Sequence, residues 1–296
     1  MKTISRLFIL LLVLSVSTVF SQDLMDMLDD DESQKVDYTY ATFKATRLIN
    51  GQSIELPPTG ALNFVISHHF GAINSGAYEF FGLDQANIRF GFDYGITDWL
   101  SVGIGRSSVK KMYDGSFKAK ILRQSTGSKK MPVTVTLFAN MAITSLKWQE
   151  PERTNYFTSR MEYAYQLLIA RKFGSRLSLQ LMPTMIHRNL VETIEDENDV
   201  FAIGAGGRIK VANRVAITGE YYYLLPGKTA DDFENVFSIG VDLETGGHVF
   251  QIFIGNSNGL IEEQFIPTTE DNWLDGDIRI GFNINRTFQV MKEKGR

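Results

Sequence analysis

Strict alternation of apolar and polar residues recurs along the chain and constrains its fold more than any other feature. Residues 87–94 read Asn-Ile-Arg-Phe-Gly-Phe-Asp-Tyr, so every second side chain is apolar, and residues 277–288 repeat the pattern. A period of two indicates a β-strand with one apolar face. Such strands build either a soluble sandwich or a barrel in lipid, and the connections between them must distinguish the two.

Twelve such strands are predicted between residues 61 and 288. They span residues 61–70, 86–96, 100–106, 116–125, 133–144, 158–173, 177–188, 200–211, 215–225, 236–244, 248–255 and 277–288. Most have one apolar face and one polar face, and water or a partner must satisfy the charges on the polar face. A sandwich also has polar faces, so alternation alone does not decide.

The connections alternate between short and long. Tight turns are expected at 97–99, 174–176, 212–214 and 245–247, and the link 126–132 is modest. The other links, 71–85, 107–115, 145–157, 189–199, 226–235 and 256–276, are longer. This rhythm is typical of outer-membrane barrels, which have short periplasmic turns and long outer loops, whereas a Greek-key sandwich needs long crossovers.

Aromatic residues give a further test of the membrane prediction. With a periplasmic N-terminus, aromatics of the apolar faces are expected near both rims, where amphipathic rings prefer the lipid interface. The periplasmic set is Tyr94, Trp99, Phe173 and Phe288, and the outer set is Phe117, Tyr163, Phe201, Tyr221, Tyr223 and Phe237. We therefore predict an all-β fold, a single antiparallel up-and-down transmembrane β-barrel of 12 strands over residues 60–290, followed by a periplasmic tail, 291–296.

The N-terminal residues predict export. Lys2 and Arg6 precede an apolar stretch, 7–19, that is too short to span a bilayer as a helix, and small residues follow. Residues 1–21 are therefore predicted to be a signal peptide, cleaved near Ser21/Gln22, and the mature chain is expected in the outer membrane of a Gram-negative bacterium. The chain has no cysteine, which excludes disulfides and a cysteine-linked lipid anchor.

Residues 22–59 are predicted to be an acidic, mostly irregular segment. The acidic run 23–32 is either a solvated spacer or a docking peptide for a basic partner. Residues 42–49 alternate and precede Pro57 and Pro58, so they form either a short extra strand or a segment tucked against the barrel.

Five stretches resemble a family of outer-membrane β-barrels of Bacteroidota to which no activity is assigned. They are 43–51 (Phe-Lys-Ala-Thr-Arg-Leu-Ile-Asn-Gly), 66–71 (Ile-Ser-His-His-Phe-Gly), 81–84 (Phe-Gly-Leu-Asp), 94–98 (Tyr-Gly-Ile-Thr-Asp) and 102–107 (Val-Gly-Ile-Gly-Arg-Ser). The resemblance continues to the C-terminus, and His69 departs from it where an arginine is expected. It implies the fold and the location but carries over no functional residue.

Charged residues on the polar faces are the candidate lumen lining. They are Arg89, Asp93, Lys118, Lys120, Arg160, Glu162, Arg208, Lys210, Glu220, Asp242, Asp277 and Arg279. They predict either a narrow channel for small solutes or paired networks that close the barrel, making it a structural or partner-docking scaffold. The expected partners are outer-membrane lipid, small solutes, and a periplasmic or surface protein. Nucleic acid is not expected, because the net charge is −4.

No enzymatic site, cofactor site or metal site is predicted. Adjacent His68 and His69 point to opposite faces of a strand, and the four histidines lack metal-ligand spacing. Residues 256–259, Asn-Ser-Asn-Gly, resemble a segment of outer-membrane phospholipases. Those enzymes need a histidine two residues before the serine as general base, and here that residue is Gly255.

Overall fold

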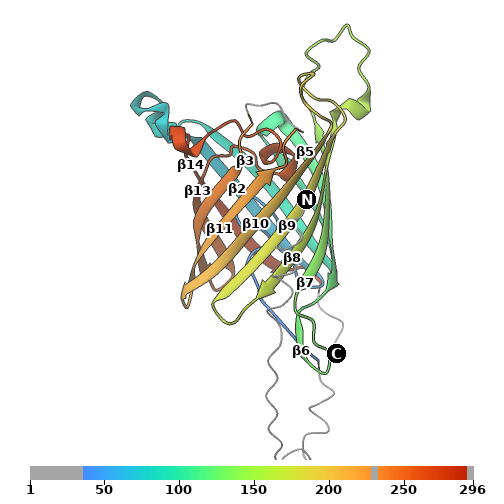
Figure 1. The fold of residues 1–296 in the computed structure, drawn as a ribbon, viewed down its shortest axis with the longest axis vertical. Helices are drawn as coiled ribbons and strands as arrows, with labels where there is room; N and C mark the ends of the chain where they lie inside the picture. The colour runs from blue at the N-terminus through green and yellow to red at the C-terminus, as the bar shows by residue number, and fades with distance from the viewer. Residues whose placement is uncertain (1–35, 228–232, 292–296) are drawn as a thin grey trace, which may run out of the picture.

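Twelve antiparallel strands close into a barrel in the computed structural model, which describes residues 36–227 and 233–291 (Figure 1). Each strand pairs with the next along the chain, and the last barrel strand pairs with the first. The barrel strands are β2 (Ala61–Ala72), β3 (Ala86–Thr97), β4 (Leu100–Ser107), β5 (Met112–Leu122), β7 (Thr134–Thr144), β8 (Met161–Lys172), β9 (Leu177–Arg188), β10 (Asp199–Ala212), β11 (Val215–Leu224), β12 (Val236–Thr245), β13 (His248–Gly255) and β14 (Arg279–Gln289). The predicted fold is confirmed, whereas the predicted signal peptide and the acidic run 23–32 lie outside the described residues.

The alternation sorts side chains between the outside and the lumen. On β3, the side chains of Phe90 and Phe92 are 43% and 40% exposed. The adjacent Arg89, whose side chain points to the other face of the strand, is only 4% exposed. Apolar residues at the outward positions of most barrel strands are exposed, and on β2 they are half-buried. Many charged residues of the strands point inward. This is the reverse of a water-soluble protein, and it suits a wall surrounded by lipid.

The two rims differ as the connections predict. Residues 98–99, 213–214 and 246–247 turn tightly at the lower rim of Figure 1, and the longer loops lie at the upper rim. At the lower rim the link between β5 and β7 contains β6 (Ser125–Gly127), which pairs with β1 (Val36–Tyr38) outside the barrel. In the described part of the chain, no helix is long and apolar enough to cross a membrane.

One predicted rim aromatic is misplaced. Phe117 lies in the middle of β5, opposite Ala139 and Val102, because β5 begins at Met112 and not at Ser116. The early part of β5 escaped prediction because Met112 faces inward, where it packs on Ile261, so the expected polar lumen residue is missing there. Tyr113, 55% exposed, takes the position near the upper rim.

The barrel interior is a packed core. Apolar side chains of β7–β12 face inward and meet apolar residues from segments that enter the lumen. The cluster contains Phe43, Leu48, Ile54, Phe138, Ala164, Leu168, Ala170, Met182, Ile186, Val200, Ala202, Tyr222, Val236, Phe265 and Ile266. A barrel of this strand number encloses more space than wall side chains alone fill, and these inserted segments occupy it.

Candidate functional site

The lumen holds an inserted hairpin formed by residues 41–60, here called the lumen hairpin. Arg47 and Gln52 form an antiparallel bridge, and the Leu48 N–H donates to the Gly51 carbonyl over 2.9 Å, which closes a turn at the tip. The segment that could have been an extra strand is therefore an internal plug. It returns to the wall at the lower rim, where Thr59 bridges Gly95.

Glycine is required at the tip of the lumen hairpin. A Cβ at Gly51 would stand 1.9 Å from the hydroxyl oxygen of Tyr222, far inside van der Waals contact. Tyr222 is fully buried on the inner face of β11. The tip backbone therefore lies directly against the barrel wall.

A single carboxylate on β11 binds the tip. The Glu220 carboxylate accepts the backbone N–H of Asn50 at 2.7 Å, and those of Ile49 and Gly51 each at 3.2 Å. Glu220 is 2% exposed. Bonds from backbone amides to a buried carboxylate are among the strong ones in proteins, so Glu220 anchors the tip through its backbone.

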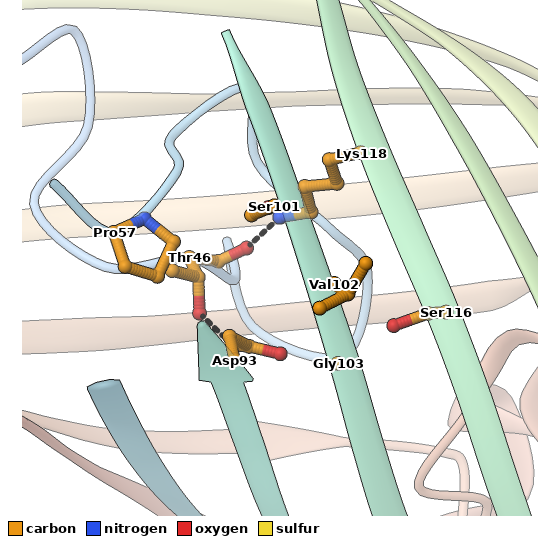
Figure 2. A pocket seen from close by; sticks show the side chains of 8 residues that line it. All are labelled: Thr46, Pro57, Asp93, Ser101, Val102, Gly103, Ser116 and Lys118. Atoms are coloured by element: carbon orange, nitrogen blue, oxygen red, sulfur yellow. Dashed lines mark hydrogen bonds between the residues drawn. The ribbon is translucent and has the colours of Figure 1, made fainter. Parts of the chain in front are cut away.

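A single ammonium on β5 binds the two strands of the hairpin. The Lys118 Nζ donates to the carbonyl oxygens of Thr46 at 2.8 Å, Ser53 at 3.0 Å and Glu55 at 3.3 Å. An ammonium has three donors and no acceptor, and here each donor has a hairpin carbonyl within reach. Figure 2 shows Thr46 between two wall residues, with its carbonyl toward Lys118 and its hydroxyl donating to Asp93 at 3.0 Å.

Neutral amides of the wall complete the binding of the hairpin backbone. Gln180 donates to the Gln52 carbonyl at 2.7 Å and accepts the Ile54 N–H at 3.0 Å. Gln251 donates to the Leu48 carbonyl at 2.6 Å. The wall thus satisfies backbone groups that would otherwise be buried without a partner, which is costly.

A second segment, residues 256–269, enters the lumen from the upper rim and is here called the loop insertion. It contains the one-turn helix α2 (Glu262–Phe265), whose residues are all buried. Asn140 of β7 donates to both carboxylate oxygens of Glu263, at 2.9 and 3.0 Å. The Arg47 guanidinium donates to the Leu260 carbonyl at 3.3 Å, so the two inserted segments contact each other.

Opposite charges from the two inserted segments share this interior. Burial raises the pKa of the Glu262 carboxyl, which belongs to a loop and not to a strand. The positive charge of Arg47 opposes this rise. The loop insertion and the lumen hairpin are thus coupled by charge as well as by the Leu260 contact.

Two arginines of the wall pair with carboxylates of neighbouring strands. The Arg89 guanidinium binds Asp114 through two bonds, of 2.9 and 2.5 Å, with both side chains almost fully buried. Arg208 pairs with Asp242 at 3.4 Å and with Glu244. Buried charges persist only when they are paired and hydrogen-bonded, and these pairs meet that condition.

The predicted lumen residues divide into an inner group and a rim group. Nine lie on inward-facing strand positions: Arg89, Asp93, Lys118, Lys120, Glu162, Arg208, Lys210, Glu220 and Asp242. Three lie at the upper rim: Arg160 is in the 3₁₀ turn η4 (Phe157–Arg160), Asp277 lies in the turn before β14, and Arg279 is the first residue of β14. At the rim, the Arg160 guanidinium lies 3.9 Å from the Trp148 ring centroid, and Asp277 accepts the Asn272 N–H at 3.1 Å.

Several residues that hold the two inserted segments in the lumen were not predicted from the sequence. Arg47, Glu262 and Glu263 lie outside the strands, and the neutral Gln180 and Gln251 carry no charge signal. The one signal for the loop insertion was an apolar run, Leu260, Ile261, Phe265 and Ile266, in a loop that should face water.

One cavity between the lumen hairpin and the wall is very small. The cavity bounded by Thr46, Pro57, Asp93, Ser101, Val102, Gly103, Ser116 and Lys118 has a volume of about 10 Å³. That is room for about one water molecule. A larger cavity, of about 270 Å³, lies at the upper rim beside the loop insertion, where Lys110, Asn256 and Arg279 help to line it.

The serine of the phospholipase-like segment makes structural contacts. The Ser257 hydroxyl accepts the Gly259 N–H at 3.1 Å and bonds the Thr269 hydroxyl at 2.9 Å. His69 is buried and bonds the Ser257 carbonyl, not its hydroxyl, at 3.0 Å, whereas His68 faces outward onto Phe282. Among the described residues, no group of three or more His, Cys, Asp or Glu side chains could hold a metal ion.

Solved structures with a similar fold share little sequence with this chain. The NanC porin is 9% identical, covering 77% of this chain and 98% of its own, with a TM-score of 0.48. An outer membrane channel from Pseudomonas putida F1 is 12% identical over 79% of this chain and 97% of its own, also with a TM-score of 0.48. An active-site mutant of outer membrane phospholipase A from Escherichia coli is 10% identical over 80% and 92%, with a TM-score of 0.43.

Family membership rests on the sequence itself. A search of the curated proteins finds no match. The family model described as "Membrane bound beta barrel domain (DUF5777)" matches residues 43–288, which include the lumen hairpin from Phe43 onward as well as the barrel strands up to β14. The chain therefore belongs to this family of membrane-bound β-barrel domains.

Proposed function

We propose that this protein is a self-plugged outer-membrane barrel, closed to solutes while the lumen hairpin is docked, that serves as a membrane-embedded scaffold. The observation that carries the proposal is the binding of the hairpin backbone by Glu220 and Lys118 from opposite strands of the wall. A narrow channel would need these charges to face water, and here they bind the plug.

The hydrogen bonds and the buried apolar residues favour the docked state of the lumen hairpin. Glu220 and Lys118 each bind three backbone groups of the hairpin. Hydrogen bonds to charged groups contribute about 1.5–3 kcal/mol each. Release of the hairpin would break these bonds and expose Leu48 and Ile54, which are buried in the apolar cluster. Spontaneous opening should therefore be rare.

The proposed location is the outer membrane of a Gram-negative bacterium, reached after cleavage of a signal peptide near Ser21/Gln22. The long loops would then face outward and the tight turns the periplasm. Bacteroidota as the source stays a prediction. The protein is proposed to have no enzymatic activity, because the Ser257 hydroxyl bonds Gly259 and Thr269 and the residue two positions earlier is Gly255.

Planar-bilayer recording tests the proposal. The wild-type protein should show no stable unitary conductance, whereas a variant with residues 42–56 replaced by a short Gly/Ser linker should conduct. A variant shortened in the exposed loop after β7, residues 147–155, is the matched control and should stay closed. Steady unitary conductance of the wild type at the level of the plug-less variant would contradict the proposal.

A partner-docking role at the periplasmic side is the second candidate. The specific observation is that β1 lies outside the barrel at the lower rim and leads directly into the lumen hairpin. A periplasmic protein that binds the preceding acidic run, 23–32, would therefore act on the plug itself. Co-purification of a partner that is lost when residues 23–32 are deleted would support this role.

A further inference from the structure

The loop between β2 and β3 displays large apolar side chains at the upper rim. Tyr78 is 93% exposed, and Phe80 and Phe81 are 59% and 52% exposed. Beside them, the 3₁₀ turn η5 (Trp273–Asp275) displays Leu274 at 94% exposure. We call these residues, together with Trp273, the aromatic foot.

The two parts of the aromatic foot are bound to each other. The Ile73 N–H donates to the Ile278 carbonyl at 2.8 Å, and the Asn74 side chain donates to Asp277 at 2.5 Å. The loop between β2 and β3 and the turn before β14 are therefore one structural unit at the rim. Figure 1 shows the two turns together at the upper left.

The aromatic foot holds its rings outward in a strained conformation. Phe80 and Phe81 have φ angles of 46° and 55°, in the left-handed region that a bulky residue rarely adopts. The turn is nevertheless ordered, because the Phe81 N–H donates to the Gly76 carbonyl at 2.8 Å. Strain of this kind, retained in an exposed turn, points to a function for the displayed side chains.

The aromatic foot lies next to the lipid-facing surface of the barrel wall. In Figure 1 this loop extends sideways from the rim, whereas the loops after β7 and β9 rise along the barrel axis. Below the foot, the outward rings of His68 and Phe282 stack with centroids 4.9 Å apart, and Phe237 packs on Trp273 with centroids 5.1 Å apart. The apolar surface of the foot thus continues the lipid-facing surface of the barrel.

The charges of the two turns limit which kind of surface the aromatic foot can contact. Residues 73–85 and 271–278 contain no lysine or arginine, but they contain the acidic residues Glu79, Asp84, Asp271, Asp275 and Asp277. Attraction to an anionic surface by charge is therefore excluded, and apolar contact remains. Aromatic residues of membrane proteins prefer the interface between the acyl chains and the headgroups.

We propose that the aromatic foot inserts into the interfacial layer of the leaflet on the long-loop side. Its binding partner is the lipid next to the barrel. The foot would then enlarge the lipid contact of the barrel on one side and fix its tilt and rotation in the membrane. The contact requires the membrane-bound barrel but not the plug, so it is independent of whether the lumen is closed.

The absence of native cysteine permits a direct test. Tyr78→Cys and, separately, Ile194→Cys are labelled with an environment-sensitive fluorophore in protein reconstituted into zwitterionic phosphatidylcholine bilayers. Ile194 is the matched control, because it is 94% exposed but belongs to the loop after β9, which rises along the axis. Lipids that carry a spin label near the headgroup serve as the quencher.

The label at position 78 should be quenched several-fold more than the label at position 194, and its emission should be blue-shifted. Added salt should change neither the quenching nor the emission. Adding Phe80→Ser and Phe81→Ser should reduce the quenching at Tyr78. Equal quenching at the two sites, or free access of aqueous iodide to the label at Tyr78, would overturn the proposal. Cross-links between Tyr78→Cys copies that appear as lipid quenching falls would also overturn it and assign the foot to contact between copies.

Discussion

The substitution Glu220→Gln tests how the lumen hairpin is held. Glutamine keeps one oxygen, which can still accept the Asn50 N–H. The amide nitrogen that replaces the other oxygen faces the N–H groups of Ile49 and Gly51, which now bond Oε2 at 3.2 Å. The Ile49 N–H is left facing a donor inside a buried site, and the Gly51 N–H keeps only its 3.4 Å contact with Oε1. The substitution therefore changes the bonding of the hairpin tip without changing its volume.

The loss in free energy of hairpin docking follows from the two bonds to Oε2. At the lower value of about 1.5 kcal/mol for each hydrogen bond to a charged group, the docked hairpin loses about 3 kcal/mol. Because about 1.4 kcal/mol corresponds to a factor of ten, the undocked population should rise roughly 100-fold. The strand pairing of β11 with β10 and β12 involves backbone groups alone and should be unaffected.

A single cysteine reports this population. Ser53→Cys is nearly isosteric, and Ser53 is fully buried in the hairpin, so a thiol reagent reaches it only when the hairpin undocks. In this background, Glu220→Gln should label roughly 100-fold faster than the parent, following the population estimate above. The matched control is Glu162→Gln, which makes the same change at an inward position of β8, where the neighbouring charge is Lys110 and not the hairpin. Equal labelling rates for the two glutamine variants would refute the anchoring role of Glu220.

Three further substitutions test the hairpin contacts and one buried ion pair of the wall. Lys118→Met removes three donors to hairpin carbonyls, and it should speed labelling of the same cysteine reporter by at least as much as Glu220→Gln. Gly51→Ala should prevent docking of the tip, because its Cβ would meet the Tyr222 hydroxyl at 1.9 Å; Tyr222→Phe in addition should restore slow labelling, and failure of this rescue would count against the close approach. Asp114→Asn leaves Arg89 without its buried partner and should lower the free energy of unfolding by about 3–5 kcal/mol, measured by urea denaturation in detergent micelles; the double change Arg89→Met with Asp114→Leu should cost less, and an equal cost would contradict a paired role.

The strands were predictable because their signals are local. Alternation with a period of two gives both the strand and its lipid-facing side, as at Phe90 and Phe92, and the tight turn at 98–99 marks a rim. Phe117 was misplaced because the inward Met112 inverts the expected pattern at the start of β5.

The position of the lumen hairpin inside the barrel was not predictable, because its contacts join residues far apart in the sequence. The alternation at residues 42–49 has the same appearance in an edge strand as in a hairpin that packs inside a barrel. Glu220 lies 170 positions from Asn50, and no local pattern tells a carboxylate that faces water from one that binds an amide. The closed barrel brings them together, so the role of Glu220 emerges only in three dimensions.

Cross-linking in the membrane tests most directly whether the lumen hairpin occupies the barrel. The Thr46 hydroxyl lies 3.0 Å from the Asp93 carboxylate, and the chain has no native cysteine. Thr46→Cys with Asp93→Cys should form an intramolecular disulfide on mild oxidation of the membrane-embedded protein, whereas Thr46→Cys with a cysteine at Asn140, which contacts the loop insertion, should not. Efficient cross-linking of the first pair alone is the predicted result, and two free thiols in both variants would contradict a plugged barrel.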